Sequence, residues 1–272
     1  MVKKLLKYEA ASYVRTMLPM LLILLGMGVL TRFVQIFEAR TTAYSIVFVS
    51  SVVALVITSL VCLVMSMVVS VVRFRSSLYT AEGYLYFTLP VTPMQHLFSK
   101  LLSAVICILV SCAAVIAALA VAGAGDMTEE VVKAGVFLLN ILAAKVGTLN
   151  TVLYVVEGLI LIIVSFTESL LLFYGCISLG QRAKKNRLLA AFGIYFAYYF
   201  ARQILGTVFI IVFSCMVYEH PQFIGDIAEW ATTHYAATTH IALCGEILLT
   251  ALLGFVYGII NLNVMKKHLN LE

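Results

Sequence analysis

Charged residues are scarce in this sequence, and their scarcity excludes most soluble folds. Only 11% of the 272 residues are charged, 63% are hydrophobic, and the mean hydropathy is +1.07. A soluble domain carries about 25% charged residues, so no water-soluble fold of this length fits the composition. The sequence therefore indicates a membrane protein.

Signatures of catalysis and of metal binding are also lacking. The sequence has no phosphate-binding G-x-x-x-x-G-K-[ST], no H-E-x-x-H and no paired-aspartate motif. Its five histidines are scattered without the spacing of metal ligands. Its six cysteines lie inside apolar runs, where free thiols behave as small hydrophobes. We therefore predict no catalytic residue, no metal site, no disulfide framework and no cofactor in this chain.

Long apolar runs are what the sequence has in abundance. A helix needs about 20 apolar residues to cross the core of a bilayer. Runs with few or no charges cover about 17–37, 44–72, 97–122, 150–179, 188–217 and 241–265. Some are longer than a crossing needs, which predicts tilted helices or helices that extend past the hydrocarbon. We expect an all-α polytopic fold with six transmembrane helices, in a single transmembrane domain over residues 1–272.

The distribution of charge predicts the orientation, because Lys and Arg accumulate in cytoplasmic loops. In a six-span arrangement one side receives most of the basic residues, which are Lys3, Lys4, Lys7, Arg15, Arg73, Arg75, Lys100, Arg182, Lys184, Lys185, Arg187, Lys266 and Lys267. The loops of the opposite side hold mostly acidic residues, which are Glu38, Asp126, Glu129, Glu130, Glu219, Asp226 and Glu229, against Arg32, Arg40, Lys133 and Lys145. We expect both termini in the cytoplasm, and the net charge of +5 is a topology signal that does not indicate nucleic-acid binding.

Three further segments have helical patterns outside the spans. In residues 1–16, apolar side chains recur at helical spacing opposite a basic face, which favours an amphipathic helix on the inner leaflet over a solvated basic tail. Pro19 would then lie in the first turn of the next helix. Residues 123–150 contain a second amphipathic helix, and the mixed aromatic and polar residues 218–240 predict an outer interfacial or re-entrant segment.

The connection between the second and third runs contains two helix starts. Thr80 is a candidate N-cap for a short helix over about 81–88, which must end before Pro90. Thr92, Pro93 and Gln95 then form a capping box with proline at the first helical position. The sequence therefore predicts a short cytoplasmic helix held between two membrane helices.

Aromatic side chains make this short helix conspicuous. Tyr84, Tyr86 and Phe87 are apolar for an exposed loop, and exposed aromatic clusters mark surfaces that bind partners. Anchoring of the same rings among lipid headgroups is the alternative. We favour docking of a partner.

At this point the sequence resembles a known family, the bacterial ABC-2-type transporter permeases. The run Glu82-Gly83-Tyr84-Leu85-Tyr86-Phe87-Thr88-Leu89-Pro90-Val91-Thr92, followed by Ser99-Lys100-Leu101-Leu102, is similar to the first cytoplasmic loop of that family. The opening Lys3-Lys4-Leu5-Leu6-Lys7-Tyr8-Glu9, the Ser178-Leu179-Gly180-Gln181 at the end of the fourth run, and the terminal Lys267-His268-Leu269-Asn270-Leu271-Glu272 are also similar. The resemblance covers nearly the whole chain.

The resemblance implies a fold and a set of partners. Members of that family have an N-terminal connecting helix, six spans, a coupling helix after the second span and re-entrant helices before the sixth. They work in the bacterial plasma membrane as pairs of permeases, either two copies or two different chains, bound to two ATP-hydrolysing subunits that hold the ATP and magnesium. The coupling helix would insert into the ATPase through residues matching Thr80, Glu82, Gly83, Tyr84, Tyr86, Phe87, Leu89 and Pro90. Arg182, Lys184, Lys185 and Arg187 would either add a secondary contact or serve only to set the topology.

Charges inside the spans form the second candidate site. Glu168 and Arg202 lie 12 and 14 residues from the inner ends of their runs, so at about 1.5 Å per residue their depths differ by only about 3 Å. We predict that they pair, as a structural ion pair or as part of a gate. Glu157 and Glu246 either line an outer vestibule for a cationic substrate or extend to the outer interface. Gly254 and Gly258 form a G-x-x-x-G, which favours close helix packing within one subunit or between two.

The function expected from these observations is that of the permease subunit of an ATP-driven exporter, which is not itself an enzyme. An ion-coupled secondary transporter that uses Glu157, Glu168 and Arg202 is the first alternative, although it would be expected to show internal repeats. A non-transporting scaffold or sensor subunit is the second. The sequence does not select a substrate.

Overall fold

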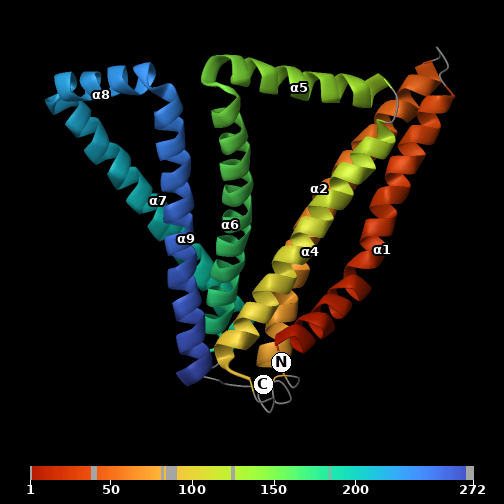
Figure 1. The fold of residues 1–272 in the computed structure, drawn as a ribbon. Coiled ribbons are helices and arrows are strands. Elements are labelled where there is room, and N and C mark those ends of the chain that lie inside the picture. Colours follow the sequence, from red (N-terminus) through yellow and green to blue (C-terminus); the bar gives the residue numbers. More distant parts are fainter. Residues whose placement is uncertain are drawn as a thin grey trace. The chain divides into compact units, whose positions relative to one another are not determined.

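The computed structural model describes residues 2–37, 42–80, 83, 91–123, 126–183 and 185–267, and this part of the chain is helical throughout apart from short turns. The helices are α1 (Val2–Ile36), α2 (Thr42–Tyr79), α4 (Pro93–Ala122), α5 (Asp126–Val146), α6 (Thr148–Gly180), α7 (Arg187–Glu219), α8 (Pro221–Thr233) and α9 (Tyr235–Lys267), as Figure 1 shows. The predicted all-α class is confirmed.

Six of these helices are long and apolar enough to cross a membrane. They cover Leu5–Ile36, Thr42–Tyr79, Pro93–Ala122, Thr148–Gly180, Arg187–Glu219 and Tyr235–Lys266. The predicted six spans are confirmed, and the chain is a multi-pass membrane protein. The 38 residues of α2 extend over about 57 Å, whereas the hydrocarbon core is about 30 Å thick, so this helix projects beyond the core as the length of its run predicts.

The transmembrane domain is organised as two compact units. The first contains Met1–Ile141 and the second Leu142–Glu272. The first unit is built from α1, α2 and α4, and the second from α6, α7 and α9 with α8.

In the first unit, α1 packs along α4 and α2. Its apolar core contains Leu24, Leu55, Cys62, Ala118 and Ala122. α1 approaches α4 closely at Gly28, because a Cβ at this position would lie 2.7 Å from the carbonyl oxygen of Ala118. Glycine is therefore needed at Gly28 for the two backbones to meet.

A stripe of buried serines runs along α2. Ser51, Ser59, Ser66, Ser70 and Ser77 are all buried. Each hydroxyl donates to a carbonyl of its own helix one turn earlier, so these polar groups are satisfied within α2. The small hydroxyl side chains allow α2 to lie close to its neighbours.

The first helix differs from its prediction, because no break separates residues 1–16 from the first span. α1 is one helix of 35 residues, and Pro19 lies inside it rather than in the first turn of a new helix. Proline removes one backbone hydrogen bond at this point, but Met17 before it and Leu24 after it are both buried, so the helix is packed on either side of the proline. The N-terminal part of α1 runs at an angle to the rest (Figure 1).

In the second unit, α6 packs along α9 and along the first part of α7. A Cβ at Gly180 would lie 2.8 Å from the backbone nitrogen of Ala191, so the end of α6 meets the start of α7 closely. Ala191 is the buried residue of α7, whose residues from 201 onward are all exposed. In agreement, α7 diverges from α6 and α9 toward α8 (Figure 1).

Two helices outside the spans match predicted segments. α5 follows the third span, and α8 joins α7 to α9 with Pro221 in its first turn and none of its residues buried. The chain turns sharply from α5 into α6 at Gly147, whose φ of 91° is a conformation that glycine adopts without strain. The position of α5 and α8 at a membrane interface stays a prediction.

Candidate functional site

The connection between α2 and α4, residues 80–92, is the first candidate site. The predicted restart of the helix is confirmed. The Thr92 hydroxyl accepts from the Gln95 backbone N–H at 3.4 Å, the Gln95 side-chain oxygen accepts from the Thr92 N–H at 3.1 Å, and Pro93 occupies the first turn. This reciprocal capping box fixes where α4 begins.

The other end of the connection is defined by Thr80 and Gly83. The Gly83 backbone N–H donates to the Thr80 carbonyl at 2.8 Å, so the chain turns at Thr80 where the N-cap is predicted. The Thr80 hydroxyl itself donates to the Ser76 carbonyl and so bonds back to α2. The other predicted coupling residues lie outside the described residues, and they are Glu82, Tyr84, Tyr86, Phe87, Leu89 and Pro90.

A buried ion pair beside this connection was not predicted from the sequence. The Lys100 ammonium lies 2.6 Å from Glu9 Oε1, and the side chains are only 3% and 5% exposed. The same ammonium donates to the Ser77 hydroxyl. The Lys100 bridge, defined as Lys100, Glu9 and Ser77, therefore joins α4, α1 and α2 at one nitrogen atom.

Arg73 adds a second cation next to the Lys100 bridge. Its guanidinium lies 4.0 Å from Glu9 Oε2, donates to the Ser12 hydroxyl, and stands 5.0 Å from the centre of the Tyr13 ring. The Arg73 side chain is 24% exposed, so it keeps contact with solvent or headgroups, whereas Lys100 does not. One carboxylate thus holds two cations from two helices.

The predicted ion pair between Glu168 and Arg202 is not formed within the described part of the chain. Glu168 is 9% exposed, and its oxygen Oε1 is buried without a hydrogen-bond partner. Its Cα lies 3.6 Å from where a Cβ of Gly254 would be, so Glu168 is on the side of α6 that faces α9. Arg202 is exposed on α7 and acts on Glu168 only at longer range.

The predicted depth of these two charges nevertheless agrees with the packing. The hydroxyls of Tyr198 and Tyr257 are hydrogen-bonded, which sets α7 and α9 in register. Arg202 is one turn after Tyr198 on α7, and Gly254, which contacts Glu168, is about one turn before Tyr257 on α9, which runs in the opposite direction. The two charges therefore share a level, and it is the direction of the side chains around each helix axis that separates them.

Glu157, predicted to line an outer vestibule or to extend to the outer interface, is paired with a histidine. The His240 imidazole nitrogen Nδ1 lies 2.8 Å from Glu157 Oε1, and the Tyr154 ring is 4.4 Å from the His240 ring. Glu157 Oε2 and His240 Nε2 are buried without hydrogen-bond partners in the described structure. Glu246, by contrast, is exposed on α9.

A third polar contact lies further along the same helix pair. The Ser178 hydroxyl donates to the Asn261 amide oxygen at 2.8 Å, and the Asn261 amide nitrogen donates to the Leu171 carbonyl at 3.1 Å. Gly254 packs against α6, while nothing in the structure lies within 4 Å of a Cβ at Gly258. The first glycine of the G-x-x-x-G therefore serves packing within the subunit.

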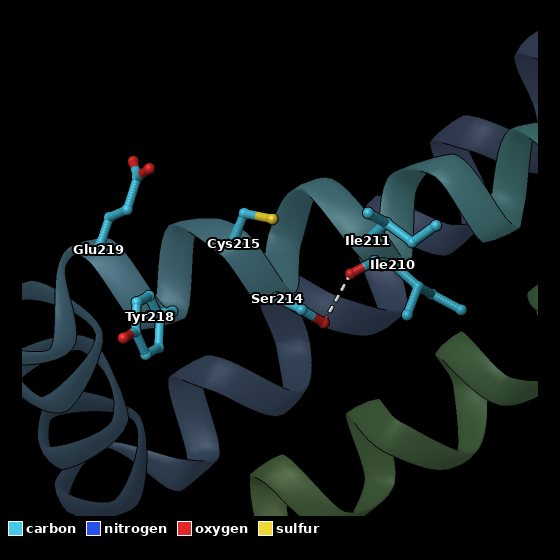
Figure 2. Close-up of a pocket in the computed structure, with 6 residues that line it drawn as sticks. All are labelled: Ile210, Ile211, Ser214, Cys215, Tyr218 and Glu219. Atoms are coloured by element: carbon cyan, nitrogen blue, oxygen red, sulfur yellow. Dashed lines mark hydrogen bonds between the residues drawn. The ribbon is translucent and has the colours of Figure 1, made fainter.

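Neither of two pockets has the form of a substrate site. A depression of about 350 Å³ is lined by Ile210, Ile211, Ser214, Cys215, Tyr218 and Glu219, all of which project from α7 alone (Figure 2). A single exposed helix forms it, so it is a surface feature of α7. The second, of about 90 Å³, lies between α1 and α4 beside Tyr13 and Cys107 and is apolar.

Within the residues that the structure describes, no group of three His, Cys, Asp or Glu side chains is arranged to hold a metal ion. Comparisons of the chain with protein-family models, with curated proteins and with solved structures find no match.

Proposed function

We propose that this chain is the membrane-spanning subunit of an ATP-binding-cassette exporter. The observation that carries the proposal is the α2–α4 connection at one end of the first unit. There α2 ends, the chain turns at Thr80, and a capping box at Thr92 begins α4. The described ends of α2 and α4 that flank this connection are tied to each other, because the Lys100 ammonium of α4 donates to the Ser77 hydroxyl of α2. That is what an ATP-hydrolysing partner requires in order to move them.

The order of the elements supports the same proposal. An amphipathic N-terminal segment, six spans, an interruption after the second span and an additional helix before the last one are the features that the resemblance to ABC-2-type permeases implies.

In this function, energy enters from outside the chain. Two ATP-binding subunits hold ATP and magnesium, and their closure displaces the segment from Thr80 to Pro90. The displacement passes into α2 and α4 and alternates the exposure of a pathway between this permease and a second one. The basic ends of the helices orient both termini toward the cytoplasm of a bacterial cell, where ATP is available.

The Glu157–His240 pair favours a second candidate function, an ion-coupled secondary transporter. Glu157 and Glu168 each have a buried oxygen without a hydrogen-bond partner in the described structure, and carboxylates inside membrane helices mark ion pathways in transporters. Such a protein would work without a partner ATPase, which separates the two candidates by experiment.

Purification from the native membrane tests the proposal. The tagged chain is expected to co-purify with an ATP-binding subunit and to show ATP hydrolysis in nanodiscs, and replacement of residues 80–89 by a Gly-Ser linker is expected to abolish both. A matched control is E129Q/K133M on the exposed face of α5, which is expected to change neither.

Two other results would contradict the proposal. If the native chain purified without any ATPase and drove solute movement in liposomes under an ion gradient alone, the secondary transporter would be correct. If an ATPase co-purified but the linker variant retained full hydrolysis and assembly, the connection would not be the docking segment.

A further inference from the structure

The Lys100 bridge lies where both ends of the α2–α4 connection meet the first helix. Ser77 precedes Thr80 by less than one turn on α2, and Lys100 lies about two turns after Pro93 on α4. Glu9 belongs to the third turn of α1. A single ammonium group thus joins the end of α2, the first turns of α4 and α1, which is distant from both in sequence.

Burial of this bridge is not explained by stability. The Lys100 and Glu9 side chains are 3% and 5% exposed, and taking two charges out of water costs several kcal/mol for each ion, which their attraction only offsets in good geometry. Apolar residues of similar volume often serve a fold equally well. A buried ion pair adds specificity to the packing, because its charges are satisfied only when the three helices keep one register.

Neighbouring polar residues also fix the register of the three helices. Arg73 also approaches Glu9, from α2, and donates to Ser12 of α1. His96, one turn before Lys100 on α4, is 1% exposed, so the polar cluster continues toward the capped start of α4. The polar contacts between α1, α2 and α4 are therefore concentrated next to the connection.

We propose that Lys100 and Glu9 are positioning residues of energy coupling: their bridge makes the two ends of the α2–α4 connection and α1 move as one body. This inference rests on the proposed function, since it assigns to the bridge the transfer of a displacement that the ATPase partner applies. Without the bridge, displacement of the connection is absorbed by separate movement of α2 and α4, and ATP hydrolysis loses its link to the spans.

The test separates coupling from folding by removing both charges together. In K100M/E9Q neither buried charge remains, and the Ser77 hydroxyl keeps its hydrogen bond to the Arg73 carbonyl. The complex with its co-purifying ATP-binding subunit is reconstituted in nanodiscs, and ATP hydrolysis is measured per assembled complex. The expected result is native assembly, a native midpoint of thermal unfolding and an unchanged KM for ATP, with kcat reduced by about fivefold or more.

Matched variants complete the design. E129Q/K133M removes an ion pair of the same 2.6 Å length that is 65% and 70% exposed on α5, and kcat is expected to stay native. S77A removes only the hydroxyl that joins the bridge to α2, and it is expected to fold and to reduce kcat by about twofold. If K100M/E9Q does not assemble, S77A decides the question.

Two results would overturn the inference, and they are distinguishable. A native kcat in K100M/E9Q, or in S77A where the double variant fails to assemble, means that the bridge is structural only, while the proposed function stands. Absence of any ATPase from the purified native complex removes the proposed function itself and the inference with it.

Discussion

The Ser178 hydroxyl donates to the Asn261 side chain at 2.8 Å across 83 positions of sequence, and this contact joins α6 to α9 inside the membrane-spanning part of the chain. Asn261 is fully buried and also donates to the Leu171 carbonyl. In the interior of a bilayer, such hydrogen-bonded side chains fix the rotation of two apolar helices about their own axes.

N261L is expected to destabilise the second unit, because it leaves the Ser178 hydroxyl and the Leu171 carbonyl without the amide. Hydrogen bonds between membrane helices contribute about 1 kcal/mol each, so the loss expected for the variant is about 1–2 kcal/mol. Unfolding in detergent measures it. Asn263 is exposed two residues further along α9, and N263L is the control that should remain within experimental error of the native protein. Equal stability of the two variants would refute the buried role.

The Lys100 bridge leads to a prediction about stability as well as coupling. K100M leaves the buried Glu9 carboxylate with one cation fewer, and breaking a buried pair by removing one partner costs about 3–5 kcal/mol. K100M/E9Q leaves neither buried charge and is expected to unfold at the native midpoint. On α5, K133M breaks an exposed pair and should cost no more than about 0.5 kcal/mol. The double-mutant cycle is measured by thermal unfolding, and additive effects of K100M and E9Q would contradict the structure.

Close approach of α1 to α4 makes Gly28 intolerant of a methyl group. A Cβ there would lie 2.7 Å from the Ala118 carbonyl oxygen and 3.2 Å from its Cα, which are both backbone atoms that side-chain rotation does not relieve. G28A is expected to cost about 1–3 kcal/mol. Two residues earlier on α1, Gly26 has nothing within 4 Å of the same position, and G26A should be neutral or slightly stabilising. A tolerated G28A would show that the helices separate without penalty.

Double-mutant cycles should also distinguish the two sets of intramembrane charges. Glu157 and His240 are in contact, so E157Q and H240Q are expected to be non-additive by about 0.5 kcal/mol or more. Glu168 and Arg202 are not in contact, so E168Q and R202A should add to within about 0.5 kcal/mol. Strong coupling of the second pair would mean that the ion pair forms in a conformation other than the one described.

Cysteine labelling tests the orientation. In a cysteine-free background, a membrane-impermeant maleimide applied to intact cells is expected to label K133C on α5 but not K185C between α6 and α7. Permeabilised cells should label both positions, which serves as the control. Labelling of K185C in intact cells would reverse the proposed topology.

Properties that depend on distance along one helix were predictable from the sequence, whereas those that depend on rotation between helices were not. Apolar runs gave the six spans, and the spacing of Thr92 and Gln95 gave the capping box. Rise per residue also placed Glu168 and Arg202 at one depth. Which way each side chain points around its helix depends on packing against neighbours, and on this the predicted pairing failed.

The Lys100 bridge illustrates the same limit. Glu9 and Lys100 are 91 positions apart, and no local pattern relates them. Lys100 lies inside the apolar run 97–122 but was grouped with the loop cations that set the topology. An isolated lysine within a span, together with an isolated glutamate in an otherwise basic amphipathic segment, is the signal that would have suggested the contact. The continuation of α1 through Pro19, with Met17 and Leu24 buried on either side of it, is likewise not predictable from the local sequence.

The serine stripe of α2 gives the first unit a mechanical asymmetry. In the middle of α2, the Ser59 and Ser66 hydroxyls donate to carbonyls of their own helix, so these two groups do not tie α2 to a neighbouring helix. At one end, Arg73 and Ser77 are held to α1 and α4, and at the other Thr31 donates weakly to the Ser51 carbonyl at 3.4 Å. The end of α2 at Arg73 and Ser77 is therefore fixed mainly by charged and polar contacts, and the part around Leu55 and Cys62 mainly by apolar packing. A tilt of α2 would therefore pivot about the end that holds Arg73 and Ser77.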